Sequence, residues 1–425
     1  MASKLKPNTT ETLSDNGSLP KGWRMVRFGD VVRDVNEAER NPIAAGLERF
    51  VGLEHIEPEN LHLKQWGLLA DGEISFTKRF RKGQVLFGKR RAYQKKVAVA
   101  EFDGICSSDI LTFEPKGSDL LPDLLPFIVQ SEGFFEHALG TSSGSLSPRT
   151  RWSQLQDYEF PLPPKDEQRR IADILWAADE CVENWKLIHS QCDALRRLLL
   201  HRCMRGQEST GSKRATTLGD LPRSWNILAI AEAGEVQLGR QRSPAYQTGE
   251  FTRPYLRVAN VFDGFLKLDD VLDMDFNARD YATFVLKPGD ILLNEGQSRE
   301  LVGRCAIYNG EIDGCCFQNT LIRFRAKSGV HPRYSFYFLQ HLFYSGEFAA
   351  VARQTTSIAH LGAERFCKLE MAIPPPDEQE RLVHVLDAIG QTVANAAGHV
   401  TATENLKRWV GDQLLSGTRC KSVIH

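Results

Sequence analysis

The sequence lacks several features by which membrane, secreted and metal-binding proteins are recognised. No apolar run approaches the ~20 residues that a membrane-spanning helix requires, and residues 1–18 are polar, without the apolar stretch of a secretory signal. The nine cysteines form no Cys-x-x-Cys pair and no paired Cys/His spacing, which argues against a zinc site or a disulfide framework. We therefore expect a cytoplasmic globular protein without a bound metal.

Motifs of enzyme active sites are also missing. Residues 83–89 read G-x-x-x-x-G-K, like the start of a phosphate-binding loop, but Arg90 follows where a magnesium-binding Ser or Thr belongs. A DNA methyltransferase would need Asn or Asp followed by two prolines and an aromatic residue, and Asn41-Pro42-Ile43 lacks the second proline and the aromatic residue. No histidine lies in a convincing pattern with Ser or Cys and a carboxylate. The sequence thus predicts no catalytic residue and no enzymatic activity.

Charge of one sign does not dominate either. The chain has 53 basic and 54 acidic residues and a formal net charge of -1, which excludes a uniformly basic surface but leaves room for a local basic patch. Its 425 residues are enough for two to four domains.

What the sequence does contain is an internal duplication. Residues 163–170 read P-P-K-D-E-Q-R-R, and residues 374–381 read P-P-P-D-E-Q-E-R, 211 positions later. The same spacing relates three residues at the far end of each helical stretch, with Leu195, Arg197 and Gly206 recurring as Leu406, Arg408 and Gly417. A period of this length is too long for a solenoid and predicts two homologous halves.

Each half combines short strand patterns with one long helix. We expect matching strands in the two halves, at 50–56, 82–87 and 103–106 and at 255–261, 288–293 and 313–316. Helical segments follow around 127–129 and 336–339. The predicted fold class is α+β (mixed α/β), with two tandem globular domains and a pseudo-two-fold internal duplication.

The long helices give the clearest local prediction. Apolar residues and cysteines recur every three or four positions from Ile171 to Leu199, as in a coiled-coil seam. Roughly 40 residues give a rod of about 60 Å. The second helix has a less regular stripe. We predict that the two helices pack on each other; the alternative is that each packs on its own globular half. The expected boundaries are a disordered tail (1–17), domain one (18–163), helix one (164–206), a linker (207–217), domain two (218–374), helix two (375–417) and a C-terminal tail (418–425).

A basic loop carries the strongest functional signal. Residues 89–96 read K-R-R-A-Y-Q-K-K directly after a predicted strand, whereas the counterpart at 294–299 reads N-E-G-Q-S-R. Lys and Arg neutralise phosphates, and Asn, Gln and Arg pair with base edges, so two such loops predict two readers of different DNA sequences. The alternative is an ordinary solvated surface. The candidate DNA-binding residues are Lys89, Arg90, Arg91, Tyr93, Gln94, Lys95, Lys96, Gln297, Ser298 and Arg299, with Arg149, Arg151, Arg240, Arg242, Arg253, Arg257 and Arg304 as weaker candidates.

Together these motifs resemble the specificity subunits of type I restriction-modification systems. The resemblance runs from Leu19 to Gly417 and rests on the duplicated helix start, on the turn at Gly83 leading into V-L-F-G-K-R, and on the segment D-G-I-C-S-S-D at 103–109. It implies a non-catalytic DNA reader with two target recognition domains, one for each part of a bipartite site. It also implies that the two long helices form an antiparallel coiled coil that sets the spacer between those parts.

The resemblance further implies partners. These are double-stranded DNA, two copies of a DNA adenine methyltransferase subunit, and translocase-nuclease subunits. S-adenosylmethionine, ATP and magnesium would belong to those partners, and this chain would bind no cofactor of its own. The repeated helix starts would dock the methyltransferases through Pro164, Glu167, Gln168, Pro375, Glu378 and Gln379. Two rival hypotheses remain open at this point: a scaffold that binds no DNA, and an enzyme with an unrecognised site.

Overall fold

The computed structural model describes residues 19–72, 74–144, 148–243, 247–354 and 357–417. The chain forms two compact units, one of residues 1–186 with 399–425 and one of residues 187–398. Both units mix helices and strands, in agreement with the predicted α+β class. The tails predicted at 1–17 and 418–425 lie outside the described residues.

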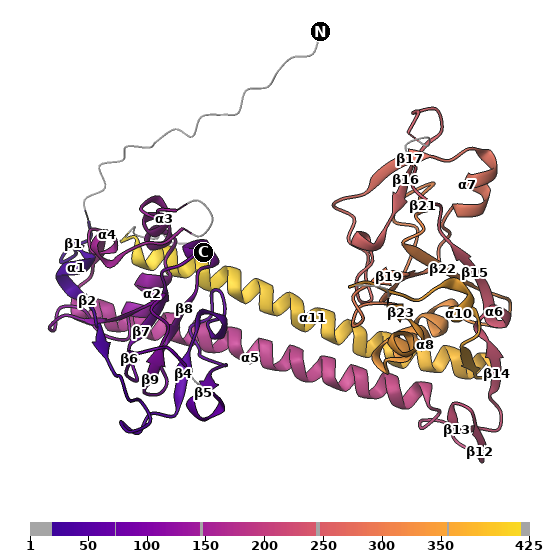
Figure 1. The fold of residues 1–425 in the computed structure, drawn as a ribbon, viewed down its shortest axis with the longest axis horizontal. Helices are drawn as coiled ribbons and strands as arrows, with labels where there is room; N and C mark the ends of the chain where they lie inside the picture. The colour runs from indigo at the N-terminus through magenta and orange to yellow at the C-terminus, as the bar shows by residue number, and fades with distance from the viewer. Residues whose placement is uncertain (1–18, 73, 145–147, 244–246, 355–356, 418–425) are drawn as a thin grey trace, which may run out of the picture. The chain divides into compact units, whose positions relative to one another are not determined.

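Unit one contains three sheets (Figure 1). A two-stranded sheet pairs β1 (Arg24–Arg27) with β11 (Glu159–Leu162). A four-stranded sheet has the order β2 (Val32–Asp34), β10 (Ile110–Pro115), β7 (Val85–Gly88) and β8 (Val97–Val99). A five-stranded sheet has the order β3 (Glu37–Ala38), β6 (Lys78–Phe80), β9 (Gly104–Cys106), β4 (Arg49–Val51) and β5 (Gly67–Leu68). The short helices are α1 (Phe28–Val31), α2 (Leu125–Gln130), α3 (Glu132–Gly140) and α4 (Trp152–Leu155).

An aromatic cluster forms the centre of unit one. The ring of Phe28 packs against those of Phe113 and Phe134, at centroid distances of 5.4 and 4.9 Å. Ile171 and Leu175 belong to the same buried cluster. Since these two residues lie near the start of the first long helix, that helix start is part of the domain core.

Unit two repeats much of this pattern. Its largest sheet has the order β15 (Gly234–Leu238), β22 (Leu321–Ala326), β18 (Ile291–Asn294) and β20 (Cys305–Ile307). Two three-stranded sheets contain β17 (Leu272–Asp275), β16 (Thr252–Leu256) and β21 (Cys316–Phe317), and β19 (Gly296–Gln297), β24 (Ala359–His360) and β23 (Arg353–Gln354). β14 (Asn226–Ala229) pairs with β25 (Glu370–Ile373). The short helices are α6 (Ile230–Ala233), α7 (Ala278–Phe284), α8 (Pro332–Tyr344), α9 (Glu347–Val351) and α10 (Ala363–Cys367).

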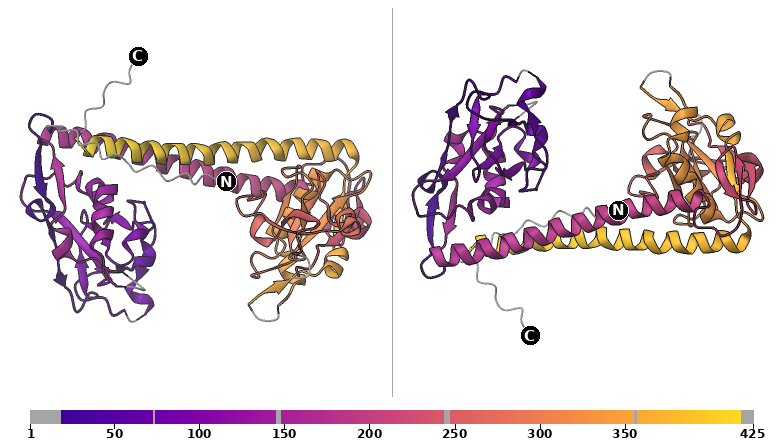
Figure 2. Two further views of the ribbon diagram at one scale, coloured as in Figure 1. Left: turned by 90° about the horizontal axis from the view of Figure 1, so that it is seen from above. Right: turned by 90° about the horizontal axis from the view of Figure 1, so that it is seen from below.

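The chain contains two long helices, α5 (Lys165–Met204) and α11 (Pro376–Leu415), each of 40 uninterrupted residues (Figures 1 and 2). Each of them contributes segments to both units. In unit one, the Trp185 ring stacks on His399 at 4.2 Å, and Lys186 pairs with Glu404 at 3.0 Å. In unit two, Met204 near the end of α5 shares a core with Leu382 near the start of α11. The helices therefore contact each other within each unit.

Only part of the predicted heptad seam of α5 is buried. Four of its positions, seven residues apart, are exposed to solvent: Ile174, Cys181, Ile188 and Leu195. The other seam positions, from Ile171 to Leu199 in steps of seven, are buried or half-buried. Further buried residues in the first half of the helix lie beside these positions: Gln168, Ala172, Leu175, Asp179 and Val182. The buried stripe differs from a two-helix seam because α5 packs on both α11 and the core of unit one.

Two local predictions also need correction. The strands expected at 50–56 and 255–261 end at Val51 and Leu256, and a 3-10 turn follows each: η1 (Leu53–His55) and η5 (Val258–Asn260). The predicted linker is partly folded, because β12 (Lys213–Thr216) forms a hairpin with β13 (Gly219–Pro222). Within the described ranges, no helix combines the length and the apolar character needed to cross a membrane.

Candidate nucleic-acid interface

The basic loop of unit one is a rigid, exposed turn. It leaves β7 at Gly88 and contains a 3-10 turn, η3 (Ala92–Gln94), flanked by Arg91 and Lys95 in the left-handed region at φ 54° and 49°. Ala92 is buried and anchors the turn, whereas the Tyr93 side chain is 55% exposed. Arg91 is exposed too, and Gln94 is half-buried. The fold therefore presents Arg91 and Tyr93 to solvent at the tip of the loop.

The two lysines at the end of this loop contact the protein itself. The Lys95 ammonium lies between Glu132 and Glu59, 3.7 Å from the latter. Lys96 Nζ donates a hydrogen bond of 2.6 Å to the carbonyl oxygen of Leu53. Because both ammonium groups already have acceptors within the protein, these contacts argue against the expected role in neutralising phosphates.

Three other predicted cations lie near the base of the loop. Arg90 and Arg149 form an isolated bridge between their backbones, and both pair with Asp109, at 3.6 and 3.3 Å. Two guanidinium groups share one carboxylate here, so the local charge is positive. Arg151 is exposed nearby, immediately before α4.

Most arginines proposed as DNA contacts in unit two already interact with other groups of the protein. Arg240 is buried, pairs with Asp280 at 2.5 Å and lies 5.1 Å above the Phe276 ring. Arg304 donates to the carbonyl oxygen of Val261 at 2.8 Å. Arg257 pairs with Asp270. Burial or pairing makes Arg240, Arg257 and Arg304 poor first candidates for DNA contact. Arg253, by contrast, lies over the Tyr281 ring but stays exposed.

The predicted second reading loop lies at a sheet edge. Gln297 is in β19, which pairs with β24, and Ser298 follows it. Both side chains are half-buried, whereas Arg299 is exposed, as is Arg242 in a different loop. The exposed cations of this unit among the predicted set are thus Arg242, Arg253 and Arg299.

The duplicated glutamines have a structural explanation that the sequence did not reveal. The Gln168 side chain is 1% exposed; it accepts from Leu121 N and donates to the carbonyl oxygens of Asp119 and Pro163, each at 2.9 Å. Gln379 is equally buried and makes the same three kinds of bond, with His331 N and the carbonyls of Gly329 and Pro374. Each glutamine ties a long helix to its own domain, so neither side chain is available to a partner.

The other predicted docking residues differ in exposure. Pro164 and Pro375 are exposed. Glu167 pairs with Arg170 one turn along α5. Glu378 accepts a hydrogen bond of 3.0 Å from the Trp225 indole and contacts Ser209. The prolines therefore remain the accessible part of the repeated motif.

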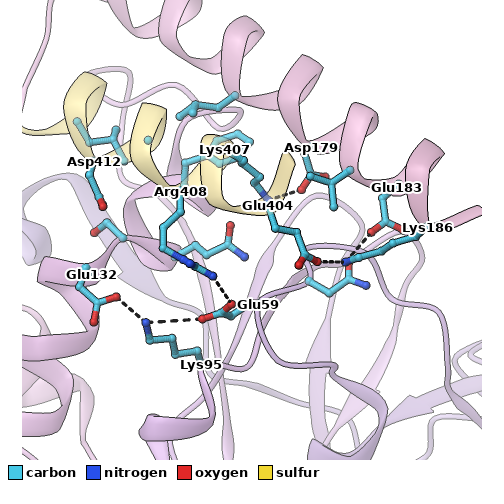
Figure 3. A pocket seen from close by; sticks show the side chains of 18 residues that line it. Glu59, Lys95, Glu132, Asp179, Glu183, Lys186, Glu404, Lys407, Arg408 and Asp412 are labelled. Atoms are coloured by element: carbon cyan, nitrogen blue, oxygen red, sulfur yellow. Dashed lines mark hydrogen bonds and ion pairs between the residues drawn. The ribbon is translucent and has the colours of Figure 1, made fainter. Parts of the chain in front are cut away.

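Sequence reasoning missed a charged network in unit one, where loops of the globular part meet the long helices. Several of its side chains line a cavity of about 90 Å³ (Figure 3). Glu59 lies in the loop after η1, and its carboxylate accepts a hydrogen bond of 3.0 Å from Arg408 of α11. Asp179 of α5 is buried and pairs with Lys407 and with His62, the latter at 2.8 Å. These contacts fix the position of the domain on both helices.

Unit two has a comparable network. Arg196 of α5 donates to the Tyr344 hydroxyl at 2.9 Å, and that hydroxyl donates to Asp263 at 2.6 Å. Gln340 also donates to Asp263, at 3.0 Å. A sequence signal for both networks exists, because the dibasic pairs 196–197 and 407–408 recur at the spacing of 211.

The network in unit one predicts a pH dependence of stability. The hydrogen bond to Asp179 raises the pKa of His62 despite its burial. A raised folded-state pKa means that the protonated imidazole stabilises the fold fully below the ordinary value of about 6.5 and that this contribution is lost as pH rises through the folded-state pKa. We expect the melting temperature to fall as pH rises above about 6.5 and the His62→Gln variant to lose part of that dependence. Equal slopes for both proteins would contradict the assignment.

Nothing in the described part of the chain resembles a metal site, since no three His, Cys, Asp or Glu side chains cluster suitably there. The described cysteines are free thiols. Burial raises the pKa of several of them, including Cys106 and Cys316, each to about 12. Such thiols are protonated and unreactive at neutral pH.

Comparisons with known proteins show which family the chain is similar to. The sequence pattern of the type I restriction modification DNA specificity domain matches residues 20–190 and 242–401. The chain is similar to the type I restriction enzyme MjaVIII specificity subunit of Methanocaldococcus jannaschii, with 22% identity over 94% of this chain and 93% of that one. It is also similar to the EcoDI specificity subunit of Escherichia coli, with 26% identity over 45% of this chain and 43% of that one.

Two solved structures share the fold. One comes from work on complex assembly and conformational transition of the type I R-M system; it has a TM-score of 0.61 and 21% identity and covers 94% of this chain and 99% of its own. The other is the specificity subunit from M. genitalium, with a TM-score of 0.52 and 13% identity, covering 98% of this chain and 99% of its own.

Proposed function

The chain belongs to the type I restriction-modification DNA specificity family, and on this premise we propose that its two halves read the two parts of a bipartite, asymmetric DNA site. The observation that carries the proposal is the contrast between what repeats and what differs. The buried glutamine anchors at 168 and 379 are the same in both units. The loops that follow β7 and β18 differ in charge and in side-chain chemistry. Identical anchors with different loops are what two readers of unlike half-sites require.

The long helices are the proposed ruler. Each has 40 residues, so each is about 60 Å long. We propose that they pair along their length as an antiparallel coiled coil that makes the pseudo-two-fold repeat of the chain. The contacts of α5 with α11 inside each unit support this arrangement. A rod of fixed length would make the spacer between half-sites a geometric property of the protein.

The proposed partners are two DNA adenine methyltransferase subunits and the translocase-nuclease subunits. These would bind S-adenosylmethionine, ATP and magnesium, while this chain supplies specificity without catalysis, in the cytoplasm. The exposed apolar side chains of α5 offer a docking face, since an exposed apolar stripe favours a protein partner. They are Ile174, Leu187, Ile188, Leu195 and Leu198.

Charges on that face should weaken methyltransferase binding. In the Ile188→Lys/Leu195→Lys double variant, burial of two large apolar side chains in the complex is lost, which is worth about 1.5–3 kcal/mol for each. We expect the dissociation constant measured with the purified methyltransferase subunit to rise at least about tenfold. Ser190 is exposed on the same helix, so Ser190→Lys adds a charge without removing apolar surface. If the double variant and this control bound the methyltransferase with equal affinity, the docking face would not include Ile188 and Leu195.

The exposed tip of the basic loop should contribute to the salt dependence of DNA binding. Arg91→Ala is expected to weaken binding on all sequences and to lower the slope of log affinity against log salt by about 1, because one phosphate contact is lost. Lys82 is exposed in the same domain but outside the loop, so Lys82→Ala serves as the matched control. Fluorescence anisotropy over a salt series provides the measurement. A slope identical to that of the control would remove Arg91 from the interface.

The decisive test is selection of bound sequences from a random DNA duplex pool, using this chain purified with its methyltransferase. Two short motifs separated by a fixed unread gap would establish the two-reader ruler. A single continuous motif, or none, would instead favour the assembly scaffold as the function of the duplication. DNA cleavage or methylation by the purified chain alone would contradict its non-catalytic role.

A further inference from the structure

Lys89 and Glu295 occupy the same backbone position in the two units. Each is the first residue after a strand of the four-stranded sheet, β7 or β18. Lys89 N donates to Asp109 O at 3.0 Å, and Lys89 O accepts from Thr150 N at 3.0 Å. Glu295 N donates to Thr320 O at 2.9 Å, and Glu295 O accepts from Leu361 N at 2.8 Å. A shared position therefore carries opposite charges in the two units.

The Lys89 side chain lines a cavity of about 380 Å³ between the two larger sheets of unit one. Other polar side chains of that cavity include Asn36, Thr77 and Ser108. Throughout the described residues, neither the Lys89 ammonium nor the side chains of these three have a hydrogen-bond or ion-pair partner. Burial lowers the pKa of Lys89, and the nearby carboxylate of Asp109 offsets this only in part. Asn36, Thr77 and Ser108 are exposed, whereas Lys89 is half-buried. A partly desolvated ammonium without a protein partner, beside accessible polar side chains, gains from a polar ligand.

The charges of the cavity favour a base edge over a phosphate. Asp34 and Glu37 also line it. The Asp34 carboxylate is held by Lys78 at 3.0 Å, and that of Glu37 by Arg81 at 2.8 Å. The cavity thus places lysine donors beside carboxylate acceptors. This mixture suits a base pair, which presents both acceptors and donors in the major groove, better than a phosphate, which presents acceptors alone. Lysine donates to the O6 and N7 acceptors of guanine, and amide, hydroxyl and carboxylate oxygens accept from the amino group of its partner cytosine.

Glu295 has the complementary chemistry. Its side chain is largely buried, and the carboxylate contacts His360 Nδ1 at 3.0 Å. Within the described residues, the other carboxylate oxygen, Oε1, accepts no hydrogen bond. A carboxylate accepts hydrogen bonds from exocyclic amino groups, above all from cytosine N4. The contact with His360 fixes the orientation of the acceptor.

We propose that Lys89 and Glu295 are matched specificity-determining residues, Lys89 donating to the O6 and N7 atoms of a guanine in one half-site and Glu295 accepting from the amino group of a cytosine in the other. The inference rests on the proposed two-reader function and adds the chemistry that each reader recognises. It also shifts the reading surface of unit one from the end of the basic loop to its first residue and the adjoining cavity.

The test compares variants by the base preference at each position of the selected DNA site, with the chain in complex with its methyltransferase. Lys89→Met is expected to lose the preference for guanine at one position of one half-site, by about five- to 150-fold, with the other half-site unchanged. Glu295→Gln is expected to lose the preference for cytosine at one position of the other half-site and to leave the half-site read by Lys89 unchanged. Lys82→Met removes an exposed lysine of the same domain and should leave both half-sites as they are. Lys89→Arg, which keeps a guanine-binding donor, should retain the guanine preference.

Several results would overturn the inference. An unchanged preference in Lys89→Met would show that the residue reads no base. Equal weakening on all sequences, with a shallower salt slope, would make Lys89 a phosphate contact. If Lys89→Met melts before it can be assayed, an unchanged guanine preference in a folded Lys89→Ala protein would likewise show that the residue reads no base. If the wild-type complex itself failed to select two motifs, the proposed two-reader function would be wrong. That outcome is distinct from failure of the present inference, because it is seen without any variant.

Discussion

Replacing Gln168 or Gln379 with leucine is expected to lower the free energy of unfolding by about 2–4 kcal/mol. The reason is the burial of both side chains, each of which satisfies one backbone N–H and two carbonyl groups. Leucine fits the volume roughly but leaves those groups without partners in an apolar environment. Denaturant titration of the purified chain would measure the loss.

Gln191 supplies the matched control. It is exposed on α5, so Gln191→Leu should change stability by less than about 0.5 kcal/mol. The same variants separate an internal anchor from a docking contact. If Gln168→Leu kept its stability but lost methyltransferase binding, the glutamine would have to reach the partner in a rearranged structure, and the anchor would be wrong.

The repeated glutamine also shows why the fold could be predicted from the sequence more accurately than the roles of individual residues. The duplication, the proline entry and the length of the helices are local signals, and α5 and α11 begin and end within two residues of the predicted 164–206 and 375–417. What Gln168 touches depends on Asp119 and Leu121, which lie almost 50 positions away. A motif therefore identified an important residue without identifying its role.

The strand predictions at 82–87, 103–106, 288–293 and 313–316 each overlap an observed strand, whereas the pair at 50–56 and 255–261 was wrong in the same way in both halves. Apolar residues predicted one continuous strand there, yet β4 ends at Val51 and β16 at Leu256, and the chain then turns into η1 or η5. His55 and Asn260 accept from the backbone N–H groups of Gly52 and Arg257, and this side-chain capping competes with strand pairing. An apolar pattern indicates which residues are buried but not whether they form a strand. After Val51 and Leu256, the buried residues belong to a turn.

Cation-rich segments were predictable as surface features but not as contacts. Lys95 and Lys96 have the same residue type as Lys89, yet the first two contact acceptors of the protein while the third lines a cavity. Acidic partners such as Glu132 come from distant positions, and their approach follows from tertiary packing alone. The charge run at 89–96 therefore predicted a functional region without separating its structural from its reading residues.

Replacing Asp179 with alanine is expected to destabilise unit one by about 3–5 kcal/mol, because the change leaves a buried charge without its partner. Asp179 is 3% exposed and faces both Lys407 and His62. Burial raises the pKa of Asp179, but hydrogen bonds from His62 and Lys407 outweigh that effect and leave it below the ordinary value. The stabilisation by this carboxylate is thus present above the unfolded-state pKa of about 4 and is lost as pH falls through the lower folded-state value.

The control and the double variant make this prediction specific. Asp173 is exposed on the same helix, so Asp173→Ala should cost less than about 0.5 kcal/mol. Adding Lys407→Met to Asp179→Ala removes the second charge and should restore part of the lost stability, whereas independent sites would give additive losses. Because Asp179 lies where His62 of the reading domain meets α5 and α11, the single variant should also broaden the range of spacer lengths selected by the complex. Loss of stability with an unchanged spacer would mean that this network holds the domain together without setting its position for DNA.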